Sequence, residues 1–441
     1  MPNRQRIIIF TRYPRPGRCK RRLIPLLGPA GAAALQRSLT QGVVAWAHLL
    51  ARQRPGLEIE VCHQGGDRLG LRSWLGPEPS YRPQGGGDLG RRMHRALARA
   101  LAQGCQGAVL VGSDIPGLTA PIMAQALEAL ARADLVLGPA RDGGYYLVGL
   151  RRPRPEVFQG LDWGGPRVLA QTLERARRAG MRIRLLEDLA DIDRPEDLPL
   201  WAQAPPVPAA TRPPGSVSVI IPTLNEAPRL ARALAPLWEE PKPVEVIVAD
   251  GGSEDGTRRR ARELGALCLR APRGRGSQMA AGAARASGES LVFLHADTLL
   301  PRGWRREVHW VLARPGVSLG AFSFAMDLAG WGPALIQRAV DWRSRFLHLP
   351  YGDQALFLRA TTLEKLGGFP TQPLMEDVAL VDRARRRGRV AISPLPARSS
   401  ARRWRRRGLW GNTLHNWATL AAYRLGAHPR RLERWYYRRP G

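Results

Sequence analysis

The sequence predicts an α/β protein with two Rossmann-like domains, each built on a parallel sheet. Short apolar runs alternate with helical stretches in both halves of the 441-residue chain. Several of these runs end in a polar corner that contains a carboxylate. A proline-rich stretch separates the halves, and the same alternation restarts after it. This arrangement is typical of sheets whose ligands bind at the carboxyl ends of the strands.

Three segments divide the chain. We expect a first domain over residues 1–201, a linker over 202–215 and a second domain with a basic aromatic tail over 216–441. Two domains of about 200 residues each fall within the usual size range. The linker holds five prolines in fourteen residues and therefore predicts an extended, semi-rigid spacer.

The composition is strongly basic, with 68 Lys and Arg against 37 Asp and Glu and a net charge of +31. Nearly all of the excess is arginine. Together with the many Ala, Gly and Pro residues, this fits a GC-rich coding sequence, which weakens the charge as evidence for nucleic-acid binding. The four cysteines show no metal-binding spacing, and no apolar run reaches the roughly 18 residues that span a bilayer. We therefore expect a soluble, reduced, cytoplasmic protein.

In the first half, a basic loop follows the first predicted strand. Residues 7–10 are β-branched and aromatic, and residues 11–23 then supply five Arg and one Lys among Gly and Pro. Such a loop suits phosphate binding, although a solvated basic loop would look the same. The strand at 108–112 ends in Ser113 and Asp114, and residues 191–193 add two more carboxylates. These acids indicate a metal site, with helix caps as the simpler alternative.

Four segments of this half, residues 11–23, 112–118, 138–147 and 191–193, together resemble a bacterial family of nucleotidyltransferase-like proteins. The family is transferase 1 of the radical-SAM/selenodomain-associated, or arsenosugar-biosynthesis, set. The resemblance implies a GT-A/nucleotidyltransferase-type fold related to guanylyltransferases of cofactor biosynthesis. It also implies that Asp114 and Asp193 hold a metal, and that the phosphates meet Arg12, Arg18, Lys20 and Arg22. The family usually shows Lys-Thr-Arg-Leu where this chain has Lys-Arg-Arg-Leu at 20–23.

The second half is organised around residues 290–300, a buried strand that runs into His295-Ala296-Asp297. A carboxylate at this strand end can hold a divalent metal against a diphosphate. Upstream, a strand ends in Asp250 with two glycines behind it, and residues 273–278 form a basic glycine-containing loop. Both features suit contact with a nucleotide.

Seven motifs occur in the order and spacing of family 2 glycosyltransferases, at 218–226, 248–253, 255–257, 295–297, 351–354, 367–369 and 375–377. The resemblance spans about residues 216–417, and within the family this segment most resembles transferase 2 of the same arsenosugar-associated set. Several motifs in order are more specific than any one alone. The resemblance implies a GT-A fold and transfer of a sugar, with inversion, from a UDP- or GDP-type nucleotide sugar to an unknown acceptor.

The same resemblance assigns roles to individual residues. The nucleotide pocket is formed by Pro222, Asn225, Glu226 and Asp250, with the diphosphate facing Arg275 and Gln278. Mg²⁺ or Mn²⁺ is held by Asp297, and His295 stands where a second carboxylate is common. Asp377 is the favoured general base, Glu376 the alternative, and Asp353 orients a substrate. Both acids also open a predicted helix, where negative charge is favoured in any case.

The tail from residue 398 onward carries twelve arginines, one acid and seven interleaved Trp and Tyr residues. We expect a helical lid over the active site. The pattern also leaves open peripheral contact with an anionic membrane, or binding of single-stranded nucleic acid without sequence specificity. Residues 400–404 resemble the Gln-x-x-Arg-Trp acceptor-side motif, with Ser in place of Gln. The rival hypothesis for the whole chain is a nucleic-acid- or membrane-binding protein whose first domain is a non-catalytic docking module.

Overall fold

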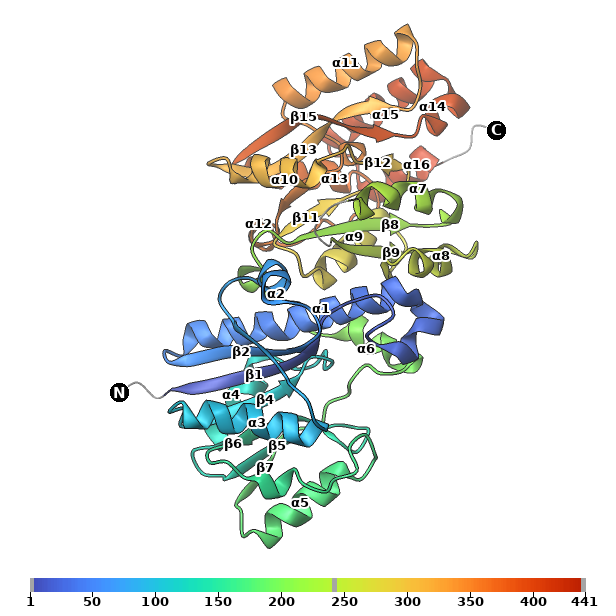
Figure 1. Cartoon of the computed structure of the whole chain (residues 1–441). Helices are drawn as coiled ribbons and strands as arrows, with labels where there is room; N and C mark the ends of the chain where they lie inside the picture. The colour runs from blue at the N-terminus through green and yellow to red at the C-terminus, as the bar shows by residue number, and fades with distance from the viewer. Residues whose placement is uncertain (1–3, 240–243, 438–441) are drawn as a thin grey trace. The chain divides into compact units, whose positions relative to one another are not determined.

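The computed structural model describes residues 4–239 and 244–437 and divides the chain into two compact units, Met1–Pro214 and Gly215–Gly441 (Figure 1). We refer to them as the N-terminal unit and the C-terminal unit. Their boundary falls at the end of the predicted linker.

The N-terminal unit alternates strands and helices. Its strands are β1 (Gln5–Arg12), β2 (Leu57–Gln64), β3 (Ser80–Pro83), β4 (Gly107–Gly112), β5 (Leu135–Pro139), β6 (Tyr145–Leu150) and β7 (Ile183–Leu185). Its α-helices are α1 (Ile24–Gln53), α2 (Arg68–Leu75), α3 (Leu89–Ala102), α4 (Ala120–Ala129), α5 (Val168–Arg178) and α6 (Leu198–Gln203). Short 3₁₀ turns occur at Arg21–Leu23, Pro155–Val157, Pro195–Asp197 and Ala209–Thr211.

The C-terminal unit repeats this alternation. Its strands are β8 (Val217–Thr223), β9 (Glu245–Asp250), β10 (Leu267–Arg270), β11 (Ser290–Phe293), β12 (Thr298–Leu299), β13 (Val317–Met326), β14 (Phe357–Arg359) and β15 (Arg389–Ser399). Its α-helices are α7 (Ala227–Trp238), α8 (Thr257–Glu263), α9 (Arg275–Arg285), α10 (Trp304–Ala313), α11 (Trp331–Phe346), α12 (Ala360–Lys365), α13 (Glu376–Arg385), α14 (Arg402–Arg407), α15 (Leu409–Arg424) and α16 (Pro429–Tyr437). One 3₁₀ turn lies at Gly352–Gln354.

The two sheets share one strand order. Within the described residues the first runs β3-β2-β1-β4-β6-β5-β7 and the second runs β10-β9-β8-β11-β14-β13-β15, with β12 added at the edge. In both, the first four strands are parallel, and β6 or β14 runs antiparallel to its neighbours. The prediction of two versions of one architecture is confirmed. The predicted parallel pairing holds for these first four strands, and the reversed strand is an addition that apolar periodicity does not encode.

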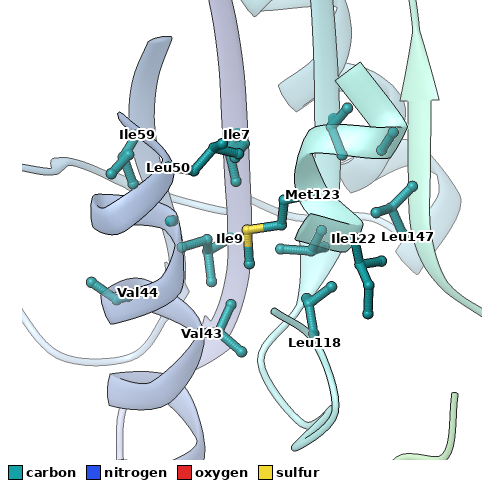
Figure 2. Close-up of a cluster of buried hydrophobic side chains, with 14 of the residues drawn as sticks. Ile7, Ile9, Val43, Val44, Leu50, Ile59, Leu118, Ile122, Met123 and Leu147 are labelled. Carbon is teal, nitrogen blue, oxygen red and sulfur yellow. The ribbon is translucent and has the colours of Figure 1, made fainter. Parts of the chain in front are cut away.

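The core of the N-terminal unit lies on both faces of its sheet. Ile7 and Ile9 of β1 pack toward α1 and α4, as Figure 2 shows, while the alternate residues Ile8 and Phe10 pack with α3 on the other face. Successive side chains of a strand point to opposite faces, so a strand covered by helices on both sides must be apolar throughout. That explains the unbroken apolar run at residues 7–10.

The proline-rich linker packs onto the N-terminal unit. Arg52 of α1 donates a hydrogen bond from Nη1 to the Ala210 carbonyl at 2.9 Å, and Val207 lies against Gly42 of the same helix. Just before the linker, the Trp201 indole donates to Ser38 Oγ at 3.1 Å. The predicted extended spacer is therefore wrong, because its apolar residues find a surface on α1.

We predict that Ile9→Ala destabilises the protein by about 2–5 kcal/mol, because it opens a cavity between the sheet and its helices. Leu69→Ala is the matched control: its side chain is 81% exposed, so a change within about 0.5 kcal/mol is expected. Urea denaturation of the full-length protein measures both. Equal effects of the two substitutions would contradict the assignment of Ile9 to the core.

Candidate functional sites

Two adjoining cavities open at the strand ends of the C-terminal unit. The larger, of about 680 Å³, is lined by Pro222 near the end of β8, by Glu226 after it, by Gln278 of α9, and by the corner after β11. The smaller, of about 110 Å³, contains Asp353 and Asp377. Residues Arg275, His295 and Asp297 line both cavities. The predicted nucleotide side and the predicted acceptor side therefore share one wall.

Strand pairing fixes the corner that carries His295 and Asp297. β11 pairs in parallel with β8, with Phe293 opposite Ile220, and the chain then turns through a hydrogen bond from the Thr298 N–H to the His295 carbonyl at 3.0 Å. The Asp297 carbonyl accepts from the Ser400 N–H at 3.0 Å. Both ends of the corner are thereby held, which leaves its side chains facing the cavities.

Gly352 lies between His295 and Asp377. A Cβ at position 352 would stand 2.9 Å from His295 Nε2 and 3.2 Å from Asp377 Oδ2. The Gly352 N–H also donates to Asp377 Oδ2 at 2.7 Å. Only a residue without a side chain fits here, so the glycine keeps the imidazole and the carboxylate close to each other.

The two adjacent acids at the start of α13 have different surroundings. Glu376 is 2% exposed and forms an ion pair with Arg275, whose Nε lies 3.1 Å from Oε1. It does not line either cavity, because this pairing turns it toward α9. Asp377 lines the smaller cavity and, among the described residues, accepts from the backbone N–H groups of Gly352 and Val378. The geometry thus favours Asp377 over the alternative Glu376 as a base.

Three residues predicted to contact the nucleotide act on the backbone instead. Asp250 is fully buried and accepts from the N–H groups of Gly252 and Ser253 at 3.1 and 3.0 Å. Asn225 is exposed, and its side chain accepts from the Glu254 N–H at 2.9 Å. Gln278 lines the larger cavity, but its amide donates to the carbonyls of Thr223 and Ala249.

These contacts give the three residues a structural role, and their contact with a nucleotide stays a prediction. The Asp250 carboxylate is bonded to the turn that follows it and does not line the larger cavity. The Gln278 amide joins the ends of β8 and β9 to each other. Asn225 likewise shapes the loop after β8.

The donor set at the shared wall suits a hard divalent cation. No cluster of three His, Cys, Asp or Glu side chains gathers within residues 4–239 and 244–437. Mg²⁺ is commonly bound through one or two carboxylates, with substrate phosphates completing the shell. Asp297, with His295 beside it, fits that limited contribution from the protein.

The N-terminal unit holds one large cavity, of about 510 Å³, at the ends of β1 and β4. Four of the predicted phosphate and metal residues line it as two ion pairs: Lys20 Nζ lies 2.8 Å from Asp114 Oδ2, and Arg22 pairs with Asp193. Arg18 is exposed and does not line the cavity. Both predicted metal ligands are thus neutralised by cationic side chains, because the loop after β1 folds back across the strand ends.

Two further guanidinium groups, those of Arg12 and Arg92, line this cavity. Burial, together with the neighbouring Arg12 guanidinium, lowers the pKa of Arg92 below its ordinary value. Arg12 and Arg92 both line the cavity, and Arg92 is held by Gln84 at 2.7 Å. Two guanidinium groups brought together in this way favour an anion between them. Arg92 lies on α3, outside the motifs that sequence comparison singles out, and was missed for that reason.

The tail covers the C-terminal cavities, as the lid prediction expected. The smaller cavity is lined by Trp404 of α14, Asn412 and Asn416 of α15 and Tyr436 of α16. The outer faces of these helices and of α11 expose large apolar side chains, including Trp331, Trp342, Leu414 and Trp417. Contact with an anionic membrane stays a prediction. None of the helices in the described ranges combines the length and apolar character that a membrane span requires.

The sequence patterns missed the two asparagines of α15. They lie in an arginine-rich, aromatic segment, and only their spacing of four residues, which places both on one helix face, marks them. Tyr351 belongs to a recognised motif but had no assigned role. It lines the smaller cavity, and burial raises its pKa, so the phenol stays protonated at neutral pH.

We predict that Lys20→Met destabilises the protein by about 1–3 kcal/mol, since the buried ammonium bonds both Asp114 and the Ile192 carbonyl. Arg18→Met, in the same loop but exposed, should change stability by less than about 0.5 kcal/mol. Thermal and urea unfolding of the full-length variants test this pair. A destabilising Arg18→Met would show that the loop is organised differently.

Comparison with known families separates the two units. Residues 48–165 match the family described as an uncharacterized protein conserved in bacteria (DUF2064), and residues 218–327 match glycosyl transferase family 2. The 2-phospho-L-lactate guanylyltransferase of Methanopyrus kandleri (strain AV19) is 41% identical over 95 residues, which cover 20% of this chain and 46% of that protein. The chain thus spans about half the length of this curated relative.

Two solved structures add to the comparison. A protein from Desulfovibrio desulfuricans G20, described as a nucleotide-diphospho-sugar transferase, is 37% identical, with 44% of this chain and 84% of that chain covered and a TM-score of 0.40. A mannosyltransferase from Pyrobaculum calidifontis, in complex with GDP-Man and Mn²⁺, is 23% identical, with 52% and 67% covered and a TM-score of 0.35. The two family matches support a fusion of a DUF2064-type domain, similar over part of its length to a guanylyltransferase, with a family 2 glycosyltransferase domain.

Proposed function

We propose that the C-terminal unit transfers a sugar from a UDP- or GDP-type nucleotide sugar to an acceptor hydroxyl, with inversion at the anomeric carbon. The observation that carries this is the shared wall of the two cavities. A donor in the larger cavity and an acceptor in the smaller one would meet beside Asp297, His295 and Arg275. A single wall between two binding spaces is what a direct displacement between two substrates needs.

The residues of the shared wall have different proposed roles in the reaction. Asp297, assisted by His295, would hold Mg²⁺ or Mn²⁺, which when bound offsets the negative charge of the departing diphosphate. Arg275 is anchored by Glu376, so its position at the wall is set before any ligand arrives. A preorganised charge of this kind stabilises developing negative charge without having to reorganise during the reaction.

Asp377 is the residue that we propose as the base for the acceptor proton. Its carboxylate is oriented by the Gly352 and Val378 N–H groups at 2.7 and 2.8 Å, and the neighbouring Tyr351 stays protonated. Inversion needs one base on the face of the sugar opposite the leaving group. Asp377 in the smaller cavity, with the donor in the larger one, meets that requirement.

For the N-terminal unit we propose nucleotidyl transfer, in which a phosphate oxygen of a sugar phosphate attacks the α-phosphorus of a nucleoside triphosphate and pyrophosphate leaves. The paired guanidinium groups of Arg12 and Arg92 support this, as does the similarity to a guanylyltransferase. The product would be a nucleotide-activated compound of the kind that the C-terminal unit consumes. The N-terminal reaction is proposed without a metal step, because Asp114 and Asp193 are already paired with cations.

The metal assignment predicts the behaviour of Asp297→Asn. The wild-type protein should gain thermal stability from UDP- or GDP-sugars, and Mn²⁺ should increase that gain. Asp297→Asn should abolish the metal-dependent part of that gain in stability. Of the three described residues that line both cavities, Asp297 alone carries a carboxylate, and the substitution removes it. Glu263→Gln, on the exposed helix α8, is the control and should behave as wild type. A full metal response in Asp297→Asn would refute the site.

The base assignment predicts that Asp377→Asn lowers the turnover of the donor by about 10²–10⁴-fold. The substitution keeps the shape of the side chain and removes its proton affinity, so nucleotide binding should be unchanged. Release of UDP or GDP from the donor, followed with and without an acceptor panel, measures the first quantity, and titration calorimetry measures the second. A loss of less than tenfold would exclude Asp377 as the base.

The anion site of the N-terminal unit predicts that Arg92→Met weakens nucleoside triphosphate binding about tenfold or more, because a charge-assisted hydrogen bond is lost. Arg91→Met is matched to it: Arg91 precedes it on α3, is exposed, and does not line the cavity. Binding and pyrophosphate release are measured on the full-length protein with a panel of triphosphates. Absence of release with every triphosphate and phosphorylated partner would count against catalysis by this unit.

A further inference from the structure

The smaller cavity of the C-terminal unit contains a buried amide whose polar atoms have no hydrogen-bond partner among the described residues. Asn412 of α15 is 1% exposed and lines the cavity. Both Oδ1 and Nδ2 are buried without a partner within that part of the chain. Its backbone N–H is occupied in the helix by the Gly408 carbonyl, at 3.2 Å. The side chain therefore presents an unused acceptor and an unused donor to the cavity.

A second unused donor lies in the same wall. The Trp404 indole Nε1 is buried and has no partner within the described residues. Asn416, one helical turn beyond Asn412, provides the contrast: its Oδ1 accepts from the Tyr436 hydroxyl at 2.9 Å. Polar side chains of the tail can thus be satisfied within the fold, as Asn416 is, whereas, in the described part of the chain, Asn412 and the Trp404 indole are not.

An unpaired amide at this position disfavours the fold. Asparagine is a weak helix former, and burial of its amide without hydrogen bonds costs free energy that an apolar side chain of similar size would not. Buried polar groups in native proteins are almost always satisfied, so a group left open beside a cavity points to a ligand. Nothing in the packing of α15 requires an amide here.

The chemistry of the open groups restricts the ligand. An amide offers a donor and an acceptor side by side, and a hydroxyl is the group that both donates and accepts. Asp297, Asp353 and Asp377 line the same cavity, whereas Arg275, which also lines it, is paired with Glu376. Three carboxylates and the Asn412 side-chain carbonyl outweigh this cation, so the cavity disfavours an anionic group. The cavity favours an uncharged ligand with neighbouring hydroxyl groups.

We infer that Asn412 recognises adjacent hydroxyl groups of a neutral sugar or polyol, with the Trp404 N–H as a second contact. At about 110 Å³ the cavity is somewhat smaller than the roughly 150 Å³ that accommodates benzene, so it admits one edge of such a molecule. The identification of this molecule as the acceptor, with its reacting hydroxyl toward Asp377, rests on the proposed function. The recognition of hydroxyl groups by Asn412 does not depend on the proposed function.

Ligand-observed NMR on the full-length protein with Mg²⁺ and UDP or GDP tests the inference. The probes are glycerol, ribitol and D-glucose as neutral polyols, and 3-phosphoglycerate as an anionic one. Wild type should bind at least one neutral probe, and Asn412→Leu should weaken that binding about tenfold or more. Thr413→Val is the matched control, because its hydroxyl already bonds the Leu409 carbonyl at 2.8 Å and it does not line the cavity.

Stability separates a structural role from recognition. Asn412→Leu should unfold at the same temperature as wild type or higher, because it removes an unpaired amide. Asn412→Ala gives the same binding test should the leucine not be accommodated. Equal binding of the neutral probes by wild type and the Asn412 variants, binding of 3-phosphoglycerate alone, or no binding of any neutral probe would overturn the inference.

The same samples report on the proposed function independently. Titration calorimetry with UDP and GDP should give equal affinities for wild type, Asn412→Leu and Thr413→Val. If no form binds a nucleotide, the proposed glycosyl transfer fails, whereas the Asn412 inference is still decided by the neutral probes.

Discussion

Both candidate sites depend on one constraint, a parallel strand pairing at the centre of each sheet: β1 with β4 in the N-terminal unit, and β8 with β11 in the C-terminal unit. In the N-terminal unit Phe10 stands opposite Gly112, and in the C-terminal unit Phe293 stands opposite Ile220. These pairings bring the polar segments that follow the strands to one edge, where the strand order reverses. A shift of the register by one residue would exchange the side chains between two faces that are packed differently, so the packing of the core fixes the position of the sites.

The two units use that common edge differently. In the C-terminal unit Asp297 faces two cavities, and the basic Arg275 is tied to a buried acid behind the wall. In the N-terminal unit the carboxylates Asp114 and Asp193 are paired directly with Lys20 and Arg22. The first arrangement leaves a carboxylate for a cation, and the second leaves guanidinium groups for an anion. One strand order thus supports two kinds of charge chemistry.

Several acidic and amide residues at the sites serve the backbone rather than a ligand. Asp250 and Gln278 use their polar atoms to hold loops and strand ends, and buried groups of this kind must be paired to be tolerated. Asn412 is the opposite case, a buried amide left open beside a cavity. The contrast separates groups that build the site from groups that await a ligand, and it is visible only in the hydrogen-bond pattern.

The sequence by itself determined the two α/β units, the position of their boundary, the strand-end location of Asp297 and Asp114, and the position of Asp377 at the start of a helix, because periodicity and motif order are local properties. The features that depend on strand order and on long-range contacts were decided only by the tertiary structure. It reversed β6 and β14 within their sheets, packed the linker onto α1, and brought Arg92 to the N-terminal cavity. It also assigned Glu376 to an ion pair and carried α15 over the smaller cavity. These outcomes depend on residues far apart in the chain, which no local pattern relates.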